Sequence, residues 1–208
     1  MIINAILITV FVAVTYALWR EGLVGAAVML LNVLLAATAA TAWYEWLAGL
    51  AFAWFPSYDY LLDFACLWGL FCVLLLVLRE TTDRVSRTRI KVRKPVEMAA
   101  TPVVAALAAW VMVCFTAASL HTAAVPRDFV QATPEARMFF GLAPDRRWLQ
   151  WVRGTTLSGP FAAASATAGG PRDPAFDRSA DFILRYAARR QTLESLPALR
   201  VLPKEGSR

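Results

Sequence analysis

Four long runs of apolar residues constrain this chain more than any other feature. A transmembrane helix needs about twenty apolar residues to cross the hydrocarbon core of a bilayer. Residues 2–19, 23–42 and 98–120 contain no charged side chain, and residues 60–78 contain only Asp63. Of the 208 residues, 59% are hydrophobic, which is more than a water-soluble protein can bury. The composition therefore excludes a protein whose whole surface faces water. The sequence predicts an all-α integral membrane protein with about four transmembrane helices.

The distribution of charge divides the chain into two parts. Residues 1–120 contain the apolar runs, whereas residues 121–208 are polar and rich in arginine. We therefore predict a four-helix transmembrane domain at 1–120, followed by an extracytoplasmic tail at 121–208 that is partly helical and partly irregular. No Lys or Arg precedes Arg20, so the first run is predicted to be an uncleaved span, because a signal peptide opens with basic residues.

The segment between the second and third runs, residues 43–57, is apolar as well. One straight helix from residue 23 to residue 55 would be about 50 Å long, which is too long for a bilayer. Aromatic residues concentrate at the headgroup level of membranes, and six of them crowd this region: Trp43, Tyr44, Trp46, Trp54, Tyr58 and Tyr60. We predict an interfacial or re-entrant helix that ends at Pro56.

The loop after the third run carries most of the basic residues of the membrane part. They are Arg79, Arg84, Arg87, Arg89, Lys91, Arg93 and Lys94. Short basic loops stay in the cytoplasm, so four crossings place both termini on the extracytoplasmic side of a bacterial inner membrane. Glu80 and Asp83 interrupt this run, and its expected partners are anionic lipid headgroups rather than nucleic acid. The favoured alternative is that these residues serve only to orient the spans during insertion.

Two short charged motifs carry a family resemblance. The chain has a tight Arg20-Glu21-Gly22 turn between its first two runs, an alanine-rich second run, and Asp83-Arg84 after the third. Together these features resemble the colicin V production protein (CvpA) family over residues 1–120. The resemblance implies a four-span inner-membrane protein linked to toxin production, in which the Arg-Glu pair keeps the hairpin out of the bilayer. The tail beyond His121 has no counterpart in the short C-terminus of that family.

The tail contains one clear amphipathic segment at residues 144–153. Pro144 and Asp145 suit the first turn of a helix. Its apolar side is formed by Trp148, Leu149, Trp151 and Val152, and its polar side by Arg146, Gln150 and Arg153. Two interpretations stay open: a helix in the membrane surface, held by its tryptophans and arginines, or a helix whose apolar face packs on the protein's own spans.

The rest of the tail gives weaker signals. Residues 161–170 are rich in Ala, Ser, Thr and Gly, which predicts a flexible linker. Residues 179–196 are predicted to form a solvated helix, with Asp181/Arg185 and Arg190/Glu194 at supportive spacing.

Small residues at four-residue spacing suggest how the spans pack, because helices in lipid gain mainly from close approach of their backbones. One stripe is Thr101, Ala105 and Ala109, and another is Ala36 and Ala40. These faces could pack within the chain or mediate self-association, or they could simply reflect how common alanine is in this sequence.

Catalytic motifs are absent from the sequence. His121 is the only histidine, which excludes a histidine-pair zinc site and leaves no histidine for a serine-protease triad. We interpret His121 as an interfacial residue, and we predict neither a catalytic residue nor a bound metal or cofactor.

Four polar residues lie within or beside the predicted spans: Asn32, Glu45, Asp59 and Asp63. Ionisable groups at membrane depth usually face a cavity or a partner, but the three acidic ones lie near the outer boundary and are predicted to be surface residues. The sequence therefore favours a non-enzymatic accessory or scaffold protein, in export or envelope maintenance. The alternative is an oligomeric channel or transporter subunit that uses Glu45, Asp59 and Asp63.

Overall fold

Helices form all of the regular structure in the part of the chain that the computed structural model describes. That part comprises residues 2–55, 58–85, 94–123, 125, 133, 136–158, 176–177 and 179–195. The helices are α1 (Ile2–Phe52), α2 (Asp59–Val85), α3 (Lys94–Ser119), α5 (Pro144–Ser158) and α6 (Phe182–Ser195). Three of them, α1, α2 and α3, are long and apolar enough to cross a membrane.

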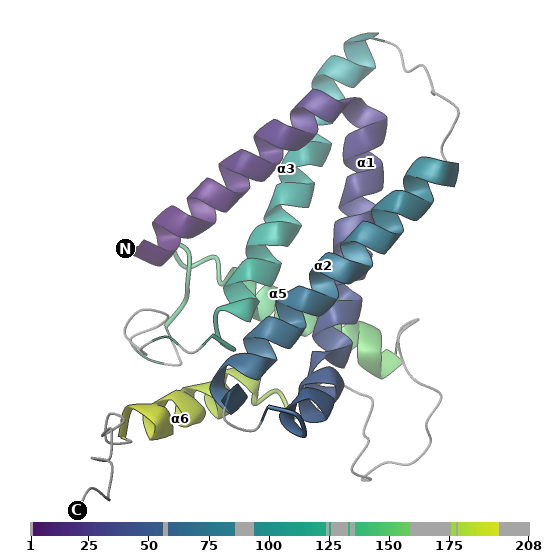
Figure 1. The fold of residues 1–208 in the computed structure, drawn as a ribbon. Coiled ribbons are helices and arrows are strands. Elements are labelled where there is room, and N and C mark those ends of the chain that lie inside the picture. Colours follow the sequence, from purple (N-terminus) through teal and green to yellow (C-terminus); the bar gives the residue numbers. More distant parts are fainter. Residues whose placement is uncertain are drawn as a thin grey trace, which may run out of the picture.

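A break at Gly22 divides α1 into two helical segments. Gly22 has φ 83° and ψ 175°, a left-handed conformation that glycine adopts without steric cost. Figure 1 shows the N-terminal segment turning sharply there into the second one. A Cβ atom at this position would also lie 3.1 Å from Glu97 Oε1. The predicted hairpin between the first two apolar runs is therefore a tight turn that requires glycine.

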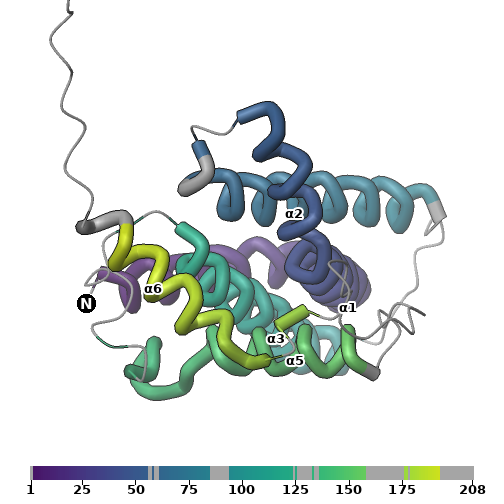
Figure 2. Tube along the Cα trace, turned by 90° about the horizontal axis from the view of Figure 1, so that it is seen from below, coloured from purple at the N-terminus to yellow at the C-terminus, as the bar shows by residue number. Residues whose placement is uncertain are grey.

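The second segment of α1 continues through most of the region predicted to form a separate interfacial or re-entrant helix. Residues 43–52 stay in α1, and Gly22 is the only non-helical position within it. No proline interrupts the helix before Pro56, so its hydrogen bonds carry on. Figure 2, which looks along much of this segment, shows its last turns leaning toward α2. A separate re-entrant helix is therefore not confirmed.

Helices α2 and α3 are longer than their apolar runs. α2 extends past residue 78 to Val85, supported by Glu80–Arg84 and Arg79–Asp83 pairs four residues apart. α3 begins at Lys94 and contains Pro102. The basic residues at 86–93 lie outside the described residues, as does the predicted linker at 161–170.

Both small-residue stripes lie inside the molecule. Thr101, Ala105 and Ala109 of α3 are buried, and so are Ala36 and Ala40 of α1. Helix α1 packs against α3 over much of its length, and the small side chains allow this close approach. These faces are thus occupied within one chain, so self-association would need other surfaces.

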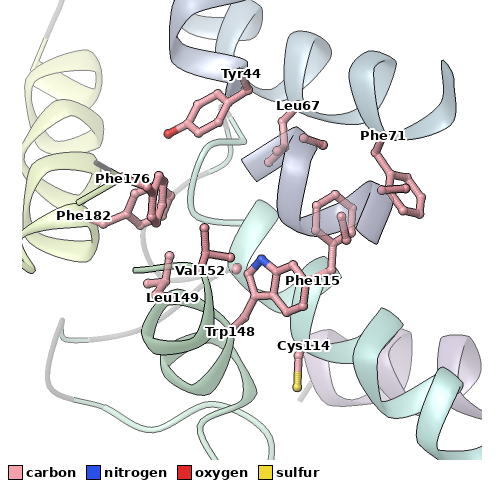
Figure 3. Close-up of a cluster of buried hydrophobic side chains, with 14 of the residues drawn as sticks. Tyr44, Leu67, Phe71, Cys114, Phe115, Trp148, Leu149, Val152, Phe176 and Phe182 are labelled. Carbon is pink, nitrogen blue, oxygen red and sulfur yellow. The ribbon is translucent and has the colours of Figure 1, made fainter. Parts of the chain in front are cut away.

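The tail helices α5 and α6 cover one end of the bundle (Figure 1), here called the tail end; the opposite end, at Gly22, is the kink end. One hydrophobic cluster joins the tail to the spans, as Figure 3 shows for Phe115 of α3, Trp148 of α5 and Phe182 of α6. Phe115 and Trp148 meet edge to face, with ring centroids 5.9 Å apart. The core thus crosses the boundary predicted at residue 120.

Candidate functional site: the polar layer at the tail end

The apolar face of α5 packs on the protein's own spans. Trp148 is 3% exposed, and its indole Nε1 donates to Thr41 Oγ1 of α1 at 3.1 Å. Trp151 donates to Thr38 Oγ1 at the same distance but stays 47% exposed. Of the two interpretations of residues 144–153, the structure shows the second, because burying Trp148 removes a large apolar ring from solvent.

The two threonines on α1 are arranged to accept these bonds. Thr41 Oγ1 donates its own proton to Ala37 O, and Thr38 Oγ1 donates to Leu34 O. A hydroxyl has one proton and two lone pairs, so each threonine keeps acceptor capacity for an indole. This arrangement places α5 at a defined height on α1.

A buried charged cluster joins α3, α5 and α6. His121 Nε2 lies 3.1 Å from Asp145 Oδ2, and Arg190 Nη2 donates to the His121 carbonyl oxygen at 3.0 Å. The residues are 1%, 0% and 6% exposed, respectively. Charged groups this deeply buried are tolerated only when they are paired. The prediction of an interfacial His121 is therefore wrong, because the tail covers it.

A second network joins α6 to the ends of α1 and α2. Tyr186 donates to Asp63 Oδ2 at 2.9 Å, and its oxygen lies 3.0 Å from the Tyr44 hydroxyl. Arg189 forms an ion pair with Asp63, and Arg185 forms one with Glu45. Burial, reinforced by the charge of Asp63, raises the pKa of Tyr186 well above its usual value.

These contacts correct two predictions from the sequence. The helix predicted at 179–196 is not solvated on all sides, since Phe182, Tyr186 and Arg190 are buried. Asp63 is partly buried rather than fully exposed, because its side chain is 16% exposed and carries the Arg189 pair. Glu45 remains half exposed.

The predicted polar membrane residues do not form one site. Glu45 and Asp63 line the same crevice at the tail end, of about 400 Å³. Asn32 lies toward the kink end, where its Nδ2 donates to Thr82 Oγ1 at 3.0 Å. The side chain of Asp59 lies outside the described residues.

At the kink end, two of the residues that carry the resemblance to the CvpA family, Glu21 and Asp83, lie close to Arg79. Glu21 Oε1 lies 3.5 Å from Arg79 Nη2, and Arg79 Nε lies 3.8 Å from Asp83 Oδ2. These residues line a small cleft of about 140 Å³ together with Asn32. Arg20 and Arg84 lie outside this cleft: Arg20 stands over the Tyr16 ring, and Arg84 pairs with Glu80.

Sequence reasoning missed the residues of the tail that complete the polar layer. They are Asp145 as a buried group, together with Arg185, Tyr186, Arg189 and Arg190. A signal was present, because Phe182, Tyr186 and Arg190 recur at four-residue spacing and share one helical face.

Neither a search for metal-binding residues nor a comparison with known proteins assigns a function to this site. Within the described residues, no group of three or more His, Cys, Asp or Glu side chains could hold a metal ion. No family model, curated protein or solved structure matches the chain. The resemblance to the CvpA family therefore stays a prediction that depends on its motif residues.

Proposed function

We propose that the chain is a non-enzymatic accessory or scaffold protein of the bacterial inner membrane, of the CvpA type, acting in toxin export or envelope maintenance. The observation that carries this proposal is the continuous core of bundle and tail, in which α5 and α6 form a fixed cap on one end. A fixed cap offers a defined surface to other envelope proteins.

The proposed placement has four crossings, with the two segments of α1 each spanning the bilayer. Large apolar side chains on the outside of the helices support contact with lipid, among them Val12, Leu31, Leu76 and Leu107. The basic residues between α2 and α3 favour a cytoplasmic kink end. The tail end and both termini are then extracytoplasmic.

Charge pairing at the tail end supports a scaffold over a channel. The alternative function, a channel, would use Glu45, Asp59 and Asp63 as its cation path. The structure describes the side chains of Glu45 and Asp63, and each pairs with an arginine of α6. A pathway for bare cations is usually lined by carboxylates alone, and an arginine beside each carboxylate repels a passing cation. His121 is fully enclosed, which supports the proposal that it has no catalytic role.

Orientation is tested by cysteine labelling in intact cells. With Cys66, Cys72 and Cys114 replaced, a cysteine at Ser86 is expected to be shielded from an impermeant thiol reagent, whereas one at Ser195 is expected to react. The reverse pattern would overturn the proposed orientation.

The choice between scaffold and channel is tested in reconstituted vesicles and by crosslinking. We expect no cation flux from the purified protein, and we expect a photo-crosslinker at exposed Leu184 of α6 to capture a defined envelope protein in cells. A cation flux that is lost in Asp63→Asn and kept in Glu80→Gln would establish the channel instead. Crosslinks to lipid alone would count against the scaffold.

A further inference from the structure

The crevice at the tail end contains charges of both signs. It lies between the last turns of α1, the start of α2 and α6, and has a volume of about 400 Å³. Glu45 and Asp63 supply two carboxylates, and Arg185 and Arg189 supply two guanidinium groups. The formal charges cancel. Such a site suits a ligand that carries one positive and one negative group, rather than an anion or a cation alone.

The remaining walls of the crevice are apolar and partly formed by small residues. The apolar ones are Ala48, Gly49, Phe52 and Leu62, and Tyr186, whose hydroxyl donates to Asp63, completes the lining. A Cβ atom at Gly49 would meet no other atom within 4 Å, so space is open along this face of α1. An alkyl chain could lie there next to the charged groups.

The adjacent face of α1 places the crevice beside lipid. Trp46 and Leu50 lie four residues apart on α1, Trp54 follows just beyond the end of the helix, and all three are exposed. Exposed tryptophans mark the headgroup level of a bilayer. The charged groups of the crevice thus lie at the depth where lipid headgroups lie, and its apolar walls lie next to the exposed stripe.

We propose that this crevice binds the headgroup of a phosphatidylethanolamine molecule. The ammonium group donates hydrogen bonds to Glu45, the phosphate accepts from Arg185, and one acyl chain lies along Gly49, while Asp63 and Arg189 stay paired beside them. The Glu45–Arg185 pair is half exposed, and pairs of this kind are weak, so the headgroup can insert between them. The proposal rests on the membrane location proposed above.

The headgroup chemistry separates this ligand from other phospholipids. Phosphatidylglycerol has no cationic group for the carboxylates, and the quaternary ammonium of phosphatidylcholine has no proton to donate to them. A charge-assisted hydrogen bond that cannot form weakens binding by about tenfold. We therefore expect selectivity of that order for phosphatidylethanolamine.

The test is native mass spectrometry of the full chain in detergent, with an equimolar mixture of these three lipids carrying identical acyl chains. Wild type is expected to retain phosphatidylethanolamine preferentially. Gly49→Leu fills the crevice without removing a charge and is expected to abolish the preference. Gly69→Leu is its matched control, because a Cβ at Gly69 of α2 also meets nothing within 4 Å, and it should keep the preference.

Charge variants and a soluble headgroup complete the test. Glu45→Gln should reduce the preference about tenfold. Arg185→Gln should weaken retention of all three lipids alike, because each carries the phosphate, and Glu80→Gln, which removes a carboxylate at the kink end, should change neither. Equal retention of the three lipids, or a preference that survives Gly49→Leu, overturns the proposal. Displacement by glycerophosphoethanolamine as effective as by the lipid identifies a soluble ligand and also overturns it. Loss of all lipid binding by wild type would instead contradict the membrane location.

Discussion

The two ends of the helical bundle both contain ion pairs but use them differently. At the tail end, His121, Asp145 and Arg190 are almost fully buried and come from three helices or their ends. At the kink end, Glu80 and Arg84 are four residues apart on one helix and largely exposed. Buried groups need their partners, whereas exposed pairs contribute little to stability. Because the Glu21–Arg79 pair between α1 and α2 is also exposed, we expect buried charged groups to stabilise the fold mainly at the tail end.

Removal of the buried carboxylate should have the largest effect. Asp145→Ala leaves the enclosed His121 without its carboxylate partner, and removing one partner of a buried pair costs about 3–5 kcal/mol. We expect the free energy of unfolding in detergent to fall by this amount, measured by denaturant titration. Asp83→Ala at the kink end is the control. Equal losses in the two variants would remove the contrast between the ends.

The two tryptophans of α5 test burial within the tail end itself. Trp148→Phe removes a buried ring edge and the bond to Thr41, which should cost about 2 kcal/mol. Trp151→Phe removes the same group from a half-exposed site and should cost about 0.5 kcal/mol. Thermal unfolding of the two variants gives the comparison, and a larger loss for Trp151→Phe would show that α5 does not pack as described.

The Tyr186 hydroxyl provides a smaller effect and a dependence on pH. Tyr186→Phe removes the bonds to Asp63 and to the Tyr44 hydroxyl. Asp63 keeps Arg189 and Tyr44 keeps Glu45 as partners, so the expected cost is about 1 kcal/mol. Burial raises the folded pKa of Tyr186 above its ordinary value of 10.0. The phenol therefore contributes its full stability below pH 10 and loses it as the pH rises toward the folded pKa.

The pH dependence distinguishes this hydroxyl from a simple packing effect. Between pH 10 and 12, the thermal midpoint of wild type should fall more steeply than that of Tyr186→Phe. Only the wild type has a phenol at position 186 that loses its proton on unfolding. Parallel curves for the two proteins would show that Tyr186 is not shielded from solvent.

The sequence predicted the features of this fold that depend on local spacing. The apolar runs, the turn at Gly22 and the amphipathic face of α5 follow from the residue order within one or two helical turns. The buried stripe around Ala105 follows from the same periodicity. The continuation of α1 through residue 52 was missed, because aromatic residues at a membrane boundary look alike in a span and in a surface helix.

The polar layer could not be predicted from the sequence, since its partners are far apart in the chain. Arg185 and Glu45 are separated by 140 residues, and Arg190 and His121 by 69. Asp181 lies four residues before Arg185, so the sequence predicted a pair between them. In the structure, Arg185 pairs with Glu45 instead. Only the docking of α6 on the bundle selects the distant carboxylate over the near one.

The smallest expected effect concerns Arg84, which the family resemblance singles out. Its guanidinium pairs with Glu80 on the same helix, and both side chains are mostly exposed, so Arg84→Gln should change stability by less than about 0.5 kcal/mol. Because the fold does not depend on this pair, the variant isolates function: normal abundance and unfolding together with a lost export or envelope phenotype would assign Arg84 to an interaction at the kink end. A loss of stability comparable to that of Asp145→Ala would show instead that the kink end also depends on charge, and the contrast between the two ends would fail.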